Sequence, residues 1–159
     1  MKMNNILDLL KNRLHSEKLI SQPKISDEQI LSFESEYGLV LPSDLVTYFK
    51  FINGSGGEYE ENFFCFYSFE QFERIDKVYA DWQGVPDYST IASTLQNYET
   101  CFVVADYQCN LFCYAVELHR EKVTGNRVYA ICGGEYKVIA NSFTEFVDLY
   151  LNNSSKLQF

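Results

Sequence analysis

The chain has 159 residues, of which 47% are hydrophobic and 16% aromatic, so it can form one domain with a substantial core but not two ordinary ones. Its 22 acidic and 13 basic residues give a net charge of -9, which repels nucleic-acid phosphates and makes DNA or RNA a poor partner. No run reaches the roughly 20 apolar residues that cross a bilayer, and no signal-peptide core is present. We therefore expect a cytoplasmic protein with no membrane partner.

The cysteines favour reduced, buried thiols over a disulfide framework. They are odd in number and mostly lie in apolar, strand-like runs: Cys65, Cys101, Cys109, Cys113 and Cys132. Cys109 and Cys113 are four residues apart and have no CxxC pair or histidine nearby, so they do not resemble a zinc site. We expect no metal and no cofactor.

The chain begins with an amphipathic helix. Ile6, Leu7, Leu10 and Leu14 share one helical face, and residues 17–24 form a linker. We divide the single domain, residues 1–159, into this N-terminal helix and linker (1–24), a core (25–151) and a frayed tail (152–159).

Two short helices follow between Ile25 and Gly57. Ser26 and Gln29 have the spacing of a capping box, and Gly38 suits a left-handed helix end. Pro42 fits the first turn of the second helix, where Asp44 complements the helix dipole. The sequence therefore predicts a helical pair that ends at Asn53-Gly54.

The middle of the chain combines an aromatic run with a fourth helix. Residues 62–69 read as a buried strand, and Ser68 and Gln71 repeat the capping-box spacing. Apolar residues at helical intervals then predict the buried side of a helix that ends near Gly84: Phe72, Ile75, Tyr79 and Trp82. Residues 87–100 fit either a short helix or a loop.

The last third changes to strands. Four apolar runs separated by turns predict an antiparallel meander: residues 101–105, 111–118, 127–132 and 135–140. Ser142 and Glu145 then open a final helix. The expected fold class is α+β, with an antiparallel sheet of about four to six strands and helices packed on one face.

The helical pair resembles the signature of the SUKH superfamily, which includes fungal cell-wall assembly and glucan-synthesis regulators and many bacterial immunity proteins. The matching residues are Ile30, Phe33, Glu34, Gly38, Leu41, Pro42, Asp44, Phe49, Asn53, Gly54 and Gly57. The chain departs from the family pattern at Cys109 and Asn110, where relatives carry a glycine and an acid. The resemblance implies binding rather than catalysis.

The polar residues fit structural roles better than catalytic ones. The glycine-rich loop after Asn53 follows a helix and runs into glutamates, unlike a phosphate-binding loop. His119 has no nucleophile in a suitable setting, and no spacing fixes two carboxylates across a cleft. We therefore predict no catalytic residues and no enzyme activity.

Two polar segments are the expected contact surfaces: the loop 54–62 and the turn 106–110. Their candidate partner-binding residues are Glu58, Tyr59, Glu60, Glu61, Asp106 and Tyr107, with carboxylates for steering and tyrosines as anchors. The resemblance implies an immunity protein that occludes a cognate toxin, and the acidic charge favours a basic toxin domain. A regulatory scaffold of glucan synthesis is the alternative, a small-ligand-binding domain is the third, and the oligomeric state stays open.

Overall fold

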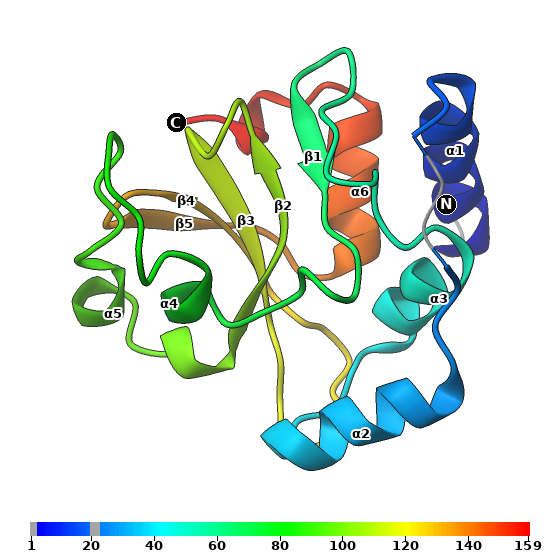
Figure 1. Cartoon of the computed structure of the whole chain (residues 1–159), viewed down its shortest axis with the longest axis horizontal. Coiled ribbons are helices and arrows are strands. Elements are labelled where there is room, and N and C mark those ends of the chain that lie inside the picture. The colour runs from blue at the N-terminus through cyan, green and yellow to red at the C-terminus, as the bar shows by residue number, and fades with distance from the viewer. Residues whose placement is uncertain (1–2, 20–22) are drawn as a thin grey trace.

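A five-stranded antiparallel sheet forms the centre of the protein. The computed structural model of the chain describes residues 3–19 and 23–159; the remainder of the predicted N-terminal helix and linker lies outside this part. Neighbouring strands follow chain order: β1 (Phe64–Phe66), β2 (Cys101–Tyr107), β3 (Phe112–Glu117), β4 (Val128–Cys132) and β5 (Glu135–Ala140). Figure 1 shows the twist that turns β4 and β5 across the other strands. The predicted α+β class and the meander are confirmed.

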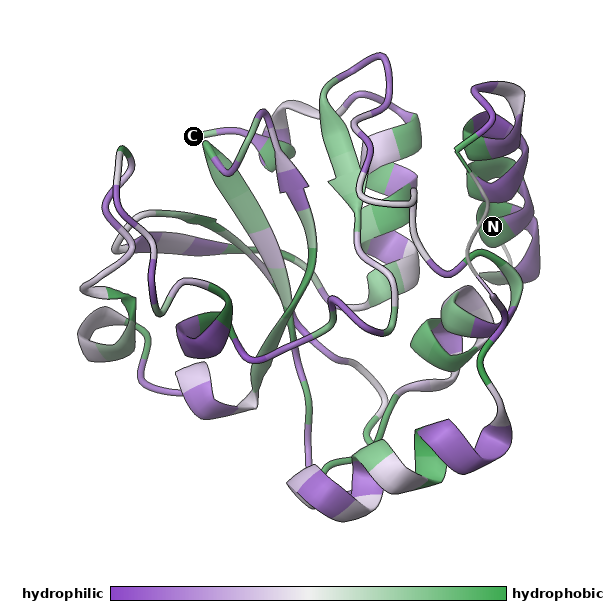
Figure 2. Cartoon of the chain, in the orientation of Figure 1, coloured by the Kyte–Doolittle hydropathy of each residue, from purple (hydrophilic) through white to green (hydrophobic). Residues whose placement is uncertain are grey.

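The four longer helices share one hydrophobic core with the sheet. They are α1 (Met3–Ser16), α2 (Asp27–Tyr37), α3 (Ser43–Phe51) and α6 (Phe143–Leu151). Their apolar stripes turn inward, and the strands are largely apolar (Figure 2). These four helices pack as predicted. Within residues 3–19 and 23–159, no helix has the length and apolar character needed to span a membrane.

The other face of the sheet is covered mainly by residues 75–98. This segment has only short helices: α4 (Ile75–Val78) and α5 (Ile91–Thr94), followed by η1 (Tyr98–Thr100). The single long helix predicted after Ser68 is therefore wrong. Phe72 packs in the first core, whereas Ile75 and Tyr79 pack in the second. A continuous helix would keep all three on one stripe, but the chain crosses from one face to the other here.

The residues that resemble the family signature build the frame of the helical pair. Ser26 and Gln29 form the predicted capping box, and Gly38 ends α2 with a left-handed φ of 64°. The Glu34 carboxylate then accepts a hydrogen bond of 2.8 Å from the Leu41 amide in the turn before α3. These contacts fix the angle at which one helix follows the other.

Asp44 connects two helices that are distant in the sequence. Its carboxylate is buried and accepts hydrogen bonds of 2.9 Å from the amide and the hydroxyl of Thr144, in the first turn of α6. It also accepts from the Leu45 amide at 2.9 Å. The sequence predicts that the Asp44 carboxylate complements the dipole of its own helix, α3. In the structure it lies beside the amino ends of both α3 and α6.

The C-terminal segment is ordered, so the predicted frayed tail is wrong. Residues Ser155–Leu157 form a short helix, η2, and Leu157 is buried in the first core. Its carbonyl accepts a hydrogen bond of 2.9 Å from the Tyr114 hydroxyl. The Leu157 side chain and the Tyr114 hydroxyl hold this segment against the protein. The sequence did not indicate this packing because the segment is mostly polar.

Candidate protein-contact surface

The two segments predicted to bind a partner lie side by side at one end of the sheet. β1 pairs with β2 so that Phe64 faces Tyr107, and the Gln108 amide donates to the Phe63 carbonyl at 2.8 Å. We call residues 56–63 and 108–111 the loop–turn surface. Its exposed members are Gly57, Glu58, Glu61, Phe63, Gln108, Cys109 and Leu111.

A buried carboxylate organises this end of the sheet from below. Asp106 accepts hydrogen bonds from the Tyr59 hydroxyl at 2.6 Å, the Tyr67 hydroxyl at 2.9 Å and the Asn110 amide at 3.0 Å. Burial raises the pKa of Asp106, and the three donors partly oppose that rise. Burial and the adjacent carboxylate also raise the pKa of Tyr59 and Tyr67, which keeps both hydroxyls protonated as donors.

The turn between β2 and β3 has an unusual backbone. Gln108, Cys109 and Asn110 have φ values of 49°, 53° and 66°, three consecutive left-handed residues without a glycine. Such residues cost free energy and persist only where the surroundings impose them. Here the Tyr79 hydroxyl donates to the Asn110 side chain at 2.7 Å, and the Tyr88 hydroxyl donates to its carbonyl at 2.8 Å. The turn is therefore held rigidly in place.

The loop 56–63 is fixed by a second buried carboxylate. Glu60 accepts from the Phe64 amide at 2.9 Å and the Tyr150 hydroxyl at 2.8 Å, while its own amide donates to the Phe64 carbonyl at 2.8 Å. Arg13 lies 3.8 Å from the same carboxylate. Ser55 pairs with Phe66 through both its amide and its hydroxyl. The loop thus closes the outer edge of β1.

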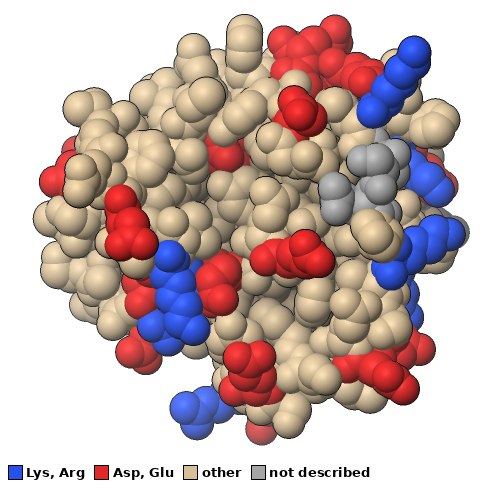
Figure 3. Space-filling model, in the orientation of Figure 1, with Lys and Arg blue, Asp and Glu red and all other residues tan. Residues whose placement is uncertain are grey.

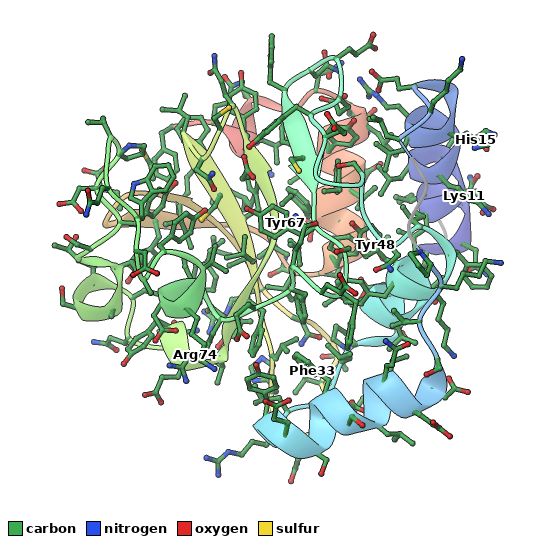
Figure 4. All side chains as sticks on the ribbon, in the orientation of Figure 1. Lys11, His15, Phe33, Tyr48, Tyr67 and Arg74 are labelled. Carbon is green, nitrogen blue, oxygen red and sulfur yellow. The ribbon has the colours of Figure 1, made fainter. Side chains whose placement is uncertain are left out.

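The interior below β1 is also pinned by tyrosine. Figure 4 shows Tyr48 and Tyr67 approaching each other from different elements, and the Tyr48 hydroxyl donates to the Tyr67 carbonyl at 2.7 Å. Full burial raises the pKa of Tyr48 well above its ordinary value. The hydrogen bond between Tyr48 and Tyr67 therefore joins the helical layer directly to the base of the loop–turn surface. The same view shows His15 away from this contact, on the outer side of α1.

The structure separates the predicted contact residues into two groups. Glu58 and Glu61 are exposed, and Tyr59 and Tyr107 are half-buried; their role in binding stays a prediction. Two other carboxylates lie inside the protein with hydrogen-bonding partners, so the prediction that they lie on the contact surface is wrong: Glu60 and Asp106. Their partners come from distant parts of the chain, which the local sequence does not reveal.

Phe63 is a candidate contact that the sequence analysis missed. It has a φ of 68° and is 55% exposed, although it belongs to an aromatic run that reads as a buried strand. Leu111, 37% exposed, lies on the neighbouring turn. Exposed apolar side chains on a rigid backbone are typical of anchors in protein interfaces.

The charge of this surface has one sign. Its exposed charged residues are Glu58 and Glu61, and residues 56–63 and 108–111 contain no lysine or arginine. In Figure 3, acidic side chains gather at the upper end of the molecule, above β1. The surface therefore presents apolar groups beside negative charge.

Cysteine, histidine and carboxylate side chains are the potential metal ligands of the chain. Among the described residues, no group of three or more His, Cys, Asp or Glu side chains is placed to hold a metal ion. Cys113 is buried, which raises the pKa of its thiol to about 12, whereas Cys109 is exposed at the apex of its turn. The expectation of buried thiols therefore fails for Cys109 and is met only in part by Cys132, which is half-buried.

Comparison with known proteins places the chain in a family. The family model described as the SMI1 / KNR4 family (SUKH-1) matches residues 24–149. The chain belongs to this family, as the resemblance of its helical pair indicated. A search of curated proteins gives no match.

Proposed function

We propose that this SUKH-1 protein is a non-catalytic binding protein that occludes a basic partner protein with its loop–turn surface. The observation that carries the proposal is the juxtaposition of two rigid segments, one ending in exposed Phe63 and the other in exposed Leu111, beside Glu58 and Glu61. The buried carboxylates of Glu60 and Asp106 fix the conformation of both segments in the absence of a partner. Binding to such a surface costs little conformational entropy.

The exposed charged residues and the exposed apolar residues of the loop–turn surface have different roles in binding. Glu58 and Glu61 carry charges without an ion-pair partner in the described part of the chain, so they steer a basic surface during encounter. Phe63 supplies apolar area to a pocket on the partner, with its ring fixed by a constrained backbone. Occlusion then needs no bond making or breaking by this chain.

The proposed partner is a cognate toxin, and the chain is its immunity protein. This assignment rests on the family and on the acidic contact surface, since enzymes that act on nucleic acids present basic surfaces to their substrate. Regulation of glucan synthesis is the alternative, and it makes a different prediction about the partner.

A capture experiment followed by a growth assay tests the proposal. The purified chain is used to capture proteins from its host, and each captured protein is expressed with and without the chain. We expect a basic protein whose toxicity disappears on co-expression. Capture of a cell-wall synthesis component, with no toxic protein recovered, would support the regulatory alternative instead.

A further inference from the structure

The two edges of the sheet are treated differently. At β1, residues of the preceding loop supply hydrogen-bonding partners for Phe64 and Phe66. At β5, the opposite edge, no backbone hydrogen bond joins the outer side of the strand to another segment within the described residues. An open edge of this kind offers unpaired amides and carbonyls to another strand.

The side chains of β5 favour such pairing. Tyr136 is 41% exposed and Val138 is 46% exposed, and both extend the face of the sheet that holds the second core. Aromatic and β-branched residues are those that stabilise neighbouring strands. Tyr136 already contacts the Tyr129 ring of β4, with centroids 5.8 Å apart, so an added strand would continue an existing apolar surface.

We infer that β5 pairs with β5 of a second copy of the chain, antiparallel and across a two-fold axis at Tyr136. In that register Glu135 of each copy lies opposite Lys137 of the other, so the interface contains two opposite-charge pairs. Lys137 is held near the edge by the Gln158 carbonyl and lies 5.0 Å from the Phe159 ring. The strand is therefore complementary in charge to itself.

The geometry of the dimer leaves the proposed contact surface free. Because β1 and β5 are opposite edges of one sheet, pairing at β5 joins the two sheets into one of ten strands (two sheets of five) and leaves the loop 56–63, beside β1, away from the interface. The inference does not depend on the proposed function. A monomeric partner would bind each copy independently.

Sedimentation equilibrium of the full chain tests this inference, with charge variants that leave the fold intact. We expect a concentration-dependent dimer, weakened roughly tenfold or more by Glu135→Lys, which sets like charges opposite each other twice. The double variant Glu135→Lys/Lys137→Glu exchanges the charges and is expected to restore dimerisation. Glu28→Lys, an equal charge change on exposed α2, is the matched control and leaves the dimer unchanged.

Three results would overturn the inference: a monomer at every accessible concentration, a dimer that Glu135→Lys does not weaken, or equal weakening by Glu28→Lys. Circular dichroism verifies that each variant is folded. If Glu135→Lys fails to fold, Tyr136→Lys takes its place, because this exposed side chain lies on the two-fold axis and its charge would face the same charge on the other copy.

Discussion

Replacement of Gly54 by alanine is expected to lower the free energy of unfolding by about 4 kcal/mol. Gly54 has a φ of 86°, which an L-residue with a Cβ rarely adopts. A Cβ at this position would lie 2.6 Å from the Ser68 amide nitrogen and 2.9 Å from the Tyr67 carbonyl carbon. These are backbone atoms, so the loop and the segment after β1 must separate to admit the methyl group. Urea unfolding measures the loss.

Gly57→Ala is the matched control for this substitution. Gly57 also has a positive φ, of 77°, but a Cβ there would meet no atom within 4 Å. Alanine at position 57 therefore has the backbone strain without the steric clash, and we expect the free energy of unfolding to fall by about 1 kcal/mol. Equal losses in the two variants would show that close packing at Gly54 contributes nothing.

Glu60→Ala is the second substitution with a large expected effect, a loss of about 3 to 5 kcal/mol of unfolding free energy. The variant removes the acceptor for the Tyr150 hydroxyl and the Phe64 amide, both of which stay buried without a partner. It also removes the carboxylate near Arg13. Chemical denaturation monitored by circular dichroism measures the change.

The neighbouring Glu61 gives the control, because its side chain is exposed and Glu61→Ala is expected to change stability by less than about 0.5 kcal/mol. A double-mutant cycle of Glu60→Ala and Tyr150→Phe, each of which removes one partner of the hydrogen bond, measures the coupling between these two residues. We expect a coupling energy of about 1 kcal/mol or more. Additive losses would contradict the role of Glu60 as a buried acceptor.

Local chemistry made much of the fold predictable. The capping box at Ser26, the left-handed Gly38 and the apolar strands and turns after Cys101 each depend on neighbours within a few residues. The long helix after Ser68 was wrong for a tertiary reason. Helical spacing identifies apolar residues, but it does not show that Phe72 and Ile75 are buried on different faces of the sheet.

The candidate site was only partly predictable for a related reason. Polar, glycine-rich and tyrosine-containing turns stand out in the sequence, so the two segments could be proposed as contact candidates, and the structure places them side by side. Glutamate and aspartate are exposed in most proteins, so Glu60 and Asp106 were expected at the surface. Their burial depends on Tyr150, 90 residues from Glu60, and on Tyr59, 47 residues from Asp106. Phe63 was missed because an aromatic run normally indicates a core strand.

The affinity of the captured partner protein for a variant with a charge-reversed loop tests the central claim most directly. The affinity is measured by calorimetry at several salt concentrations for Glu58→Lys/Glu61→Lys and for a control with the same charge change on exposed residues of α2, Glu28→Lys/Glu36→Lys. We predict a loss on the order of 100-fold for the loop variant, with a weaker salt dependence, and little change for the control. Equal affinities for the two variants would contradict the assignment of the loop–turn surface as the binding site.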